Sequence, residues 1–269
     1  MKKLIALLIA VVTCFGLVSM AGCNVDPAKD LERIEKRGYY VVGYTDYDPF
    51  AFTEGDKLVG FDIELAEAVA EELGIEVKFQ LITWSKKVTE IKSGNIDVIW
   101  NAMTITDELK KQIDISDAYV NNNQAVVVKA GNEAQYATKE ALLTTKIALE
   151  DGSSAYAAVK ADSILKDAQT LPCEDQLAAL QEVAAGTSKV AIVDVLLYDS
   201  LKVKDNSIVN SGNLVKVSGI TFPPEQFGIG FRKGSPFKAE VEAALAALKA
   251  NGTYAEIAAK YNMTNNLVD

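Results

Sequence analysis

The sequence contains no histidine and only three cysteines. Catalysis of the Ser-His-Asp or Cys-His type is therefore excluded, because both arrangements need an imidazole to move the proton of the nucleophile. Cys14 and Cys23 lie in or beside an apolar leader, which leaves Cys173 alone in the rest of the chain. An internal disulfide and a cysteine zinc cluster are thus not expected. The carboxylates also lack the close spacing of a calcium loop, so we expect no metal and no cofactor.

Basic residues are outnumbered by acidic ones. The chain carries 27 Lys and Arg against 37 Asp and Glu, a formal charge of −10. Binding to nucleic acid needs clustered positive charge to neutralise phosphates, and so does an electrostatic attachment to anionic lipid. Neither kind of partner is expected for this protein.

The N-terminus has the three parts of a secretory signal. Lys2 and Lys3 precede an apolar run from Leu4 to Val18, and a stretch of small residues leads to Cys23. A transmembrane helix is the alternative, since the apolar stretch is close to the ~20 residues that cross a bilayer. The ending Ala21-Gly22-Cys23 resembles the bacterial lipobox, although Met20 stands where leucine is usual. This resemblance implies removal of residues 1–22, attachment of diacylglycerol and an acyl chain such as palmitate to Cys23, and a location on the outer face of the cytoplasmic membrane.

Strand and helix patterns alternate along the rest of the chain. A polar tether over residues 23–36 is followed by two alternating runs, 39–122 and 146–222. Such alternation predicts an α/β fold with mostly parallel sheets and helices on both faces. Asp62 is expected to cap the helix that follows it. Ligands bind beyond the carboxyl ends of parallel strands, which directs attention to the segments after Trp100, Leu149 and Val193.

Five stretches resemble a known family, the bacterial extracellular solute-binding proteins of family 3, which bind polar amino acids for ABC importers. Their order and spacing carry the resemblance, and they lie at residues 42–50, 59–65, 93–101, 103–106 and 227–234. The resemblance implies a type II periplasmic-binding-protein fold with two mixed, mostly parallel sheets and a ligand cleft between two lobes. It assigns residues 31–122 and 226–269 to lobe one and 123–225 to lobe two. The expected partners are a small polar solute, an ABC permease and its ATPase.

The family's aromatic ligand contacts correspond to Tyr47 and Trp84. Flat rings suit this role because they offer a large apolar area and can face a cation. Both could instead be ordinary core aromatics, and Phe50 stands midway between a ligand contact and a core residue.

The family's polar ligand contacts correspond to Asn101, Ala102 and Thr104 in one loop and to Ser153, Ser154 and Asp194 in the other lobe. Hydroxyl and N–H groups at a helix start favour an anion, although Ser153 and Ser154 could simply cap the helix. Asp194 ends a buried strand and is expected to accept the solute's ammonium group, with helix capping as the alternative.

One position departs from the family pattern. The arginine that normally clamps the solute's carboxylate is replaced by Leu109. Lys110 cannot simply take over, because one residue along a helix turns the side chain by about 100°. Lys86, Lys87 and Arg232 remain as other cations that could reach the carboxylate.

Several acidic residues are expected near the cleft: Asp46 and Asp48 beside Tyr47, and Glu150 and Asp151 before Gly152. They could form a solvated face, or they could make the cleft negative and select a cationic solute such as a basic amino acid or an amine. A solute sensor for a membrane partner is an alternative function. A dehydratase-like enzyme on the same fold is a weaker one, since fold alone does not settle function.

Overall fold

The computed structural model describes residues 25–268. The predicted signal, the lipid site at Cys23 and the first residues of the tether lie outside this range. No helix within 25–268 has both the length and the apolar character that crossing a bilayer requires. The later part of the predicted tether is a packed helix, α1 (Asp30–Arg37), in which Asp30 and Ile34 are fully buried.

The first lobe is built on a six-stranded mixed sheet. Its strand order is β4-β1-β5-β13-β6, with β7 paired to the end of β13, and β1 runs parallel to both β4 and β5 whereas β13 is antiparallel to its neighbours. The strands are β1 (Tyr39–Tyr44), β4 (Glu76–Leu81), β5 (Val98–Thr104), β6 (Asp114–Ile115), β7 (Val120–Asn122) and β13 (Glu225–Phe231). A small hairpin, β2 (Phe52–Glu54) and β3 (Lys57–Val59), lies beside it.

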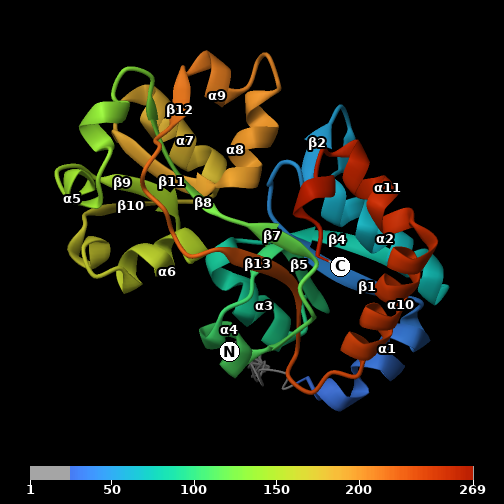
Figure 1. The fold of residues 1–269 in the computed structure, drawn as a ribbon. Coiled ribbons are helices and arrows are strands. Elements are labelled where there is room, and N and C mark those ends of the chain that lie inside the picture. Colours follow the sequence, from blue (N-terminus) through green and yellow to red (C-terminus); the bar gives the residue numbers. More distant parts are fainter. Residues whose placement is uncertain (1–24, 269) are drawn as a thin grey trace, which may run out of the picture.

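The helices of this lobe cover both faces of the sheet (Figure 1). They are η1 (Pro27–Lys29), α1, α2 (Phe61–Leu73), η2 (Trp84–Lys86), α3 (Lys87–Ser93), α4 (Asp107–Gln112), α10 (Phe237–Asn251), α11 (Thr253–Lys260) and η5 (Thr264–Asn266). Coverage on both faces explains why the first six residues of β5 are buried without alternation.

The second lobe contains a five-stranded mixed sheet with the order β10-β9-β11-β8-β12. Its strands are β8 (Gln124–Lys129), β9 (Ile147–Glu150), β10 (Thr170–Cys173), β11 (Val190–Asp194) and β12 (Leu214–Lys216). Its helices are η3 (Glu133–Tyr136), α5 (Lys139–Leu142), α6 (Ser154–Ala161), η4 (Leu165–Asp167), α7 (Gln176–Ala185), α8 (Val195–Lys202) and α9 (Ile208–Ser211).

The chain passes between the two sheets twice. It leaves the first sheet through β7, enters β8 at Gln124, and returns along residues 217–224 into β13 (Figure 1). The two passages lie side by side because Asn122 on β7 pairs with Glu225 at the start of β13. Polar side chains of both passages therefore meet at the junction of the lobes.

Asp62 is not the helix cap that the sequence predicts. The helix α2 begins at Phe61 after Gly60, whose φ of 135° and whose approach to Phe50 leave no room for a side chain: a Cβ there would lie 2.2 Å from the Phe50 carbonyl oxygen. Asp62 instead points into the core and accepts hydrogen bonds from the Ala102 amide (2.8 Å) and the Tyr119 hydroxyl (2.9 Å). Burial raises the pKa of its carboxyl group to about 7.

A buried arginine ties the end of β13 to the first lobe. Arg232 donates to Asp30 (2.7 Å) and Asp97 (2.9 Å), and also to the carbonyls of Ile91 and Ile96. Its guanidinium is thus fully engaged away from the cleft, and Arg232 cannot serve as the carboxylate clamp that the sequence left open.

Replacing Arg232 with methionine is expected to lower the free energy of unfolding by about 3 kcal/mol or more, because two buried carboxylates lose a charged partner. Arg33→Met is the matched control, since Arg33 also pairs with Asp30 but keeps 35% of its side chain exposed. This control is expected to cost less than about 1 kcal/mol. Urea titrations measure the free energy of unfolding of both variants. An equal decrease in the two would contradict a larger contribution of the buried Arg232 ion pairs to stability.

Candidate functional site

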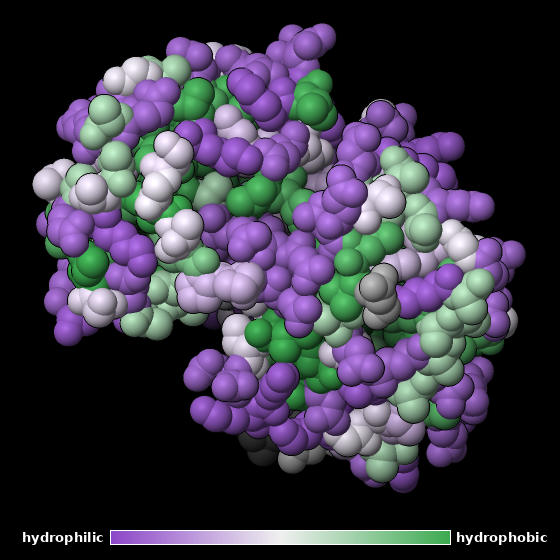
Figure 2. All heavy atoms as spheres, viewed as in Figure 1, coloured by the Kyte–Doolittle hydropathy of each residue, from purple (hydrophilic) through white to green (hydrophobic). Residues whose placement is uncertain are grey.

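The candidate site lies where the carboxyl ends of β5, β9 and β11 face the two connecting segments. Figure 2 shows hydrophilic residues gathered in the middle of the molecule, where the two lobes meet. Three acidic side chains converge here: Glu150 at the end of β9, Asp194 at the end of β11, and Glu225 at the start of β13. Glu150 and Asp194 are only 5% and 3% exposed, and Glu225 is half-buried.

Asp194 bonds to side chains of both lobes. Its carboxylate accepts hydrogen bonds from the Tyr47 hydroxyl of the first lobe (2.6 Å), from Asn122 on β7 (2.6 Å), and from the side-chain amides of Gln124 and Gln176. Its side chain makes no helix-capping bond, so the capping alternative does not hold. Burial raises the pKa of Asp194, and the four neutral donors oppose that shift.

Glu225 accepts hydrogen bonds from the same two amides, Gln124 (2.9 Å) and Asn122 (3.1 Å). The hydroxyls of Thr104 and Ser154, one from each lobe, complete its surroundings at 3.2 and 3.3 Å. Burial raises the pKa of Glu225 to about 7, with the Asp194 charge as the next cause. Burial likewise raises the pKa of Glu150 to about 8, again with Asp194 as the next cause.

The described part of the chain supplies these three acids with no ion-pair partner, since no Lys or Arg nitrogen there lies within 4.0 Å of them. Three side-chain carbonyl oxygens in the same region, those of Asn101, Asn122 and Gln124, are buried without a donor from the described residues. The site is thus rich in acceptors, and a buried acceptor without a donor is costly. It fits a solute rich in N–H donors and positive charge.

A cavity of about 170 Å³ lies between residues of the two lobes. Its walls include six positions that the family resemblance assigns to the ligand site, Trp84, Ala102, Thr104, Leu109, Ser153 and Ser154. The other six lining residues are Lys87, Met103, Thr106, Glu108, Gly152 and Ala157. A neighbouring cavity of about 460 Å³ shares Thr104 and Ser154 and is lined by Glu225. Trp84 therefore stands at the cavity as the family resemblance implies.

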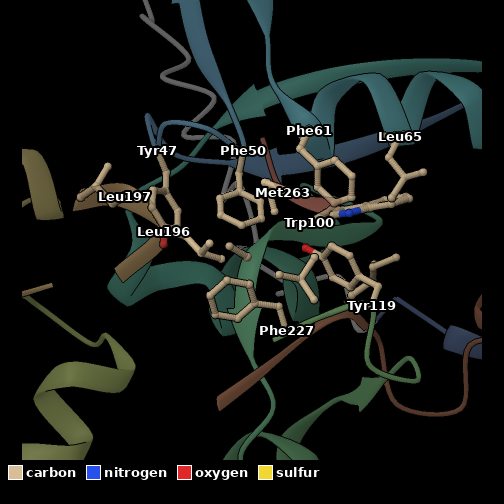
Figure 3. Packing of buried hydrophobic residues seen from close by; sticks show 14 of the residues in the cluster. Tyr47, Phe50, Phe61, Leu65, Trp100, Tyr119, Leu196, Leu197, Phe227 and Met263 are labelled. Atoms are coloured by element: carbon tan, nitrogen blue, oxygen red, sulfur yellow. The ribbon is translucent and has the colours of Figure 1, made fainter. Parts of the chain in front are cut away.

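The aromatic residues of the loop after β1 do not line this cavity. Figure 3 shows the Tyr47 ring between Phe50 and the α8 residues Leu196 and Leu197. Phe50 is fully buried and packs edge-on against Phe61 and Phe227, which makes it a core residue. Tyr47 reaches the site through its hydroxyl on Asp194, so its role in this conformation is a hydrogen bond and not a stacking surface.

The last residues of β5 are fixed by hydrogen bonds to the core of the first lobe. Ala102 has a left-handed φ of 51°, and its amide donates to Asp62, so this N–H does not point to the cavity as a free donor. The Asn101 side chain donates to the Thr45 hydroxyl (2.8 Å) and keeps its oxygen unpaired. Asp62 thus positions a strained peptide at the cavity wall.

The hydroxyls of Ser153 and Ser154 make different hydrogen bonds. The Ser153 hydroxyl caps α6 by accepting from the Tyr156 amide (3.1 Å), as the capping alternative proposes, while its residue still lines the cavity. Ser154 bonds to Gln124 and Glu225 instead. The α6 N-terminus therefore faces the cavity with one serine capping and one serine joined to the acidic network.

The remaining acids of the sequence analysis lie elsewhere. Asp46 is exposed beside a third cavity, which is lined by Tyr47 and Lys204. Asp48 is paired with Lys204 and accepts from the Ser200 hydroxyl (2.6 Å), which joins the two lobes at their outer edge. Asp151 is exposed, so only Glu150 of these four acids is buried at the site.

Sequence reasoning missed Glu225, Asn122, Gln124, Gln176 and Asp62 as parts of the site. The signal for Asn122 and Gln124 was present, because amides that flank a predicted crossing segment are unusual next to the apolar run at 126–128. Glu225 lies in the other crossing segment. Only the pairing of the two segments brings these side chains together.

Comparison with known proteins agrees with this architecture. Residues 40–264 match the bacterial extracellular solute-binding proteins, family 3. The chain is 29% identical over 259 residues to the L-cystine-binding protein TcyJ of Escherichia coli strain K12, with 94% of each chain covered.

Two solved structures extend the comparison. An ancestral arginine-binding protein bound to arginine has a TM-score of 0.75 and 35% identity, covering 84% of this chain and 98% of its own. An ancestral amino acid-binding protein described as a precursor of cyclohexadienyl dehydratase has a TM-score of 0.76 and 32% identity, covering 86% and 98%. The two mixed sheets seen here are the type II arrangement of these amino-acid-binding proteins. The chain belongs to the bacterial extracellular solute-binding proteins of family 3.

Proposed function

We propose that this protein is the substrate-binding lipoprotein of an ABC importer, and that it captures a cationic amino acid or a related small cationic solute by closing its lobes. The observation that carries the cationic assignment is the group of three acids, Glu150, Asp194 and Glu225, that converge in the cleft without an ion-pair partner among the residues that the structure describes. Buried charge without a partner is strongly unfavourable. A cationic solute would supply the missing partner.

The neutral donors around the acids support the same reading. Asn122 and Gln124 each bridge Asp194 and Glu225, and each keeps a buried carbonyl oxygen without a donor. An ammonium or guanidinium group offers several N–H donors in a small volume. Such a group would satisfy carboxylates and orphan carbonyls together.

Contacts between the lobes support capture by closure. Tyr47 bonds to Asp194 across the cleft, Lys87 donates to the Gly152 carbonyl, and Ser200 donates to Asp48. The lobes come so close at Gly152 that a Cβ there would lie 3.0 Å from the Ser85 Cα. Hinge closure of two lobes over a ligand, with a closed form that docks on a partner, follows a common mode of motion.

What the related proteins bind supports import of an amino acid. One solved relative is bound to arginine and another similar protein binds L-cystine. Lipid attachment at Cys23 and a location on the outer face of the cytoplasmic membrane rest on the leader sequence. Binding without catalysis is the proposed role, and an import role in place of a sensing role would be supported by genes for a permease and an ATPase beside this one.

A titration panel tests the assignment. The mature protein is expected to bind L-arginine, L-lysine or L-ornithine more tightly than L-glutamine or L-glutamate, because the site offers negative charge to the solute. Isothermal titration calorimetry measures each affinity. Tight binding of glutamate or glutamine with no binding of any cationic compound would contradict the proposal.

Glu225→Gln tests the charge that sequence reasoning missed. Loss of this carboxylate is expected to weaken binding of the best cationic ligand by roughly 10- to 100-fold, since one charge partner disappears. The same variant is expected to stabilise the unliganded protein at pH 8 by roughly 1–3 kcal/mol, because a carboxyl whose pKa is raised destabilises the folded state when ionised. Glu240→Gln on the exposed side of α10 is the control, and equal behaviour of both variants would remove Glu225 from the site.

The unliganded protein is expected to melt at a lower temperature at pH 8.5 than at pH 6. Glu225 and Glu150 have folded pKa values of about 7 and about 8, above the ordinary value of 4.5. Their favourable contribution is therefore complete below about pH 4.5 and is lost as the pH rises through 7 and 8. A melting temperature that rises over this interval in differential scanning calorimetry would contradict the raised pKa values.

A further inference from the structure

Lys87 is a buried lysine at the mouth of the cleft. It is the first residue of α3, only 7% exposed, and its neighbour Lys86 is exposed. Lysine is seldom fully buried unless it is paired. No Asp or Glu oxygen within residues 25–268 lies within 4.0 Å of its ammonium group, so the burial of Lys87 must be explained by the site itself.

The ammonium group of Lys87 is held by two backbone carbonyls. It donates to the Gly152 carbonyl of the second lobe (3.0 Å) and more weakly to the Trp84 carbonyl (3.3 Å), and it lies 4.5 Å from the centre of the Trp84 ring. An ammonium group has three N–H donors and carries a full charge. Two neutral carbonyls leave one donor and the charge uncompensated.

The cavity that Lys87 lines offers further groups that suit an anion. The N-terminus of α6 reaches it through Ser153 and Ser154, and the first N–H groups of a helix have no intrahelical acceptor. Thr104 lines the cavity too, with its hydroxyl donating to Glu225. Among the described residues that line this cavity, Lys87 is the one Lys or Arg, and Leu109, which replaces the family's arginine, lines it too.

We propose that Lys87 binds the carboxylate of the solute and so replaces, from another helix, the arginine that Leu109 has removed. This assignment rests on the proposed function. It divides the recognition of a cationic amino acid in two: Lys87 and the α6 N-terminus take the carboxylate, while Asp194, Glu225 and Glu150 take the positive groups. The site then favours a solute with two positive groups and one negative group over one with a single positive charge.

The charges in the cleft agree with this division. Glu150 and Asp151 favour the charged form of Lys87, although burial is the larger effect and lowers its pKa to about 8. The cavity that Lys87 lines shares Thr104 and Ser154 with the cavity that Glu225 lines, so a solute that occupies both can pair with Lys87 and with this acid. A buried lysine that served only to hold two carbonyls would make no difference between solutes with and without a carboxylate.

Matched pairs of ligands separate the two possibilities. We would titrate the wild-type protein and Lys87→Met with L-arginine and agmatine, and with L-lysine and cadaverine, in which each amine lacks only the carboxylate. Methionine keeps the length and apolar stem of lysine, so the fold is expected to survive, and a melting curve of each variant checks this. Lys86→Met is the control on the exposed side of the same segment, and Lys87→Arg tests rescue by another cation.

Lys87→Met is expected to weaken binding of the amino acid by about 30-fold or more and to change binding of the matching amine by less than about threefold. Lys86→Met is expected to leave both unchanged, and Lys87→Arg to keep part of the preference for the amino acid. An unchanged ratio of the two affinities in Lys87→Met would overturn the assignment, as would a wild-type protein that prefers the amines. A wild-type protein that binds neither member of any pair would instead overturn the proposed function, and the Lys87 assignment with it.

Discussion

Most of the site depends on one buried carboxylate that has no cation beside it. Asp194 ends a buried strand of the second lobe, yet its oxygens accept from Tyr47 of the first lobe and from Asn122 and Gln124 of the connecting segment. The energetic constraint is that a desolvated charge must be matched by donors or by an opposite charge. Here residues 25–268 provide Asp194 only with neutral donors, and they place two more acids, Glu150 and Glu225, within electrostatic reach. In the described part of the chain, the junction of the two lobes thus contains three acidic side chains and lacks the positive charge that would balance them.

The lack of positive charge beside these acids links the fold to the proposed function. A site that destabilises its own unliganded closed form at neutral pH gains more from a ligand that removes the repulsion, and an equilibrium shifts only by such differential affinity. The rigid parts of the molecule lie behind the site. Arg232 fixes the end of β13 to α1 and β5, and Asp62 holds the strained Ala102 peptide. The residues that face the solute can therefore be polar and lack some of their hydrogen-bond partners, because the contacts of Arg232 and Asp62 behind the site stabilise the fold.

The sequence alone predicted the alternating α/β organisation, because buried strands and capped helices follow period and composition. It also predicted Trp84, Thr104, Ser154 and Asp194 as residues near one cleft, through the family's spacing. It assigned Tyr47 to a stacking contact and left Phe50 midway between a ligand contact and a core residue, because a local pattern does not show which side of each ring packs inward. It also predicted Asp62 as a helix cap, whereas the side chain turns into the core. Glu225 could not be identified for another reason, and Lys87 could be named only as one of three possible cations, beside Lys86 and Arg232. Their roles arise from the pairing of two distant crossing segments and from the approach of two lobes, and neither is a local pattern.

The central claim is that the cleft acids bind a cationic solute. Because their pKa values are raised, they must give up protons when the solute binds, and proton linkage measures this directly. The binding enthalpy of the best cationic ligand would be determined at pH 7 in buffers with different ionisation enthalpies. Because Glu150 and Glu225 have pKa values of about 8 and about 7 without ligand, a bound cation should lower these pKa values and release about one proton per ligand. An enthalpy that does not depend on the buffer, or one that indicates proton uptake, would contradict the account.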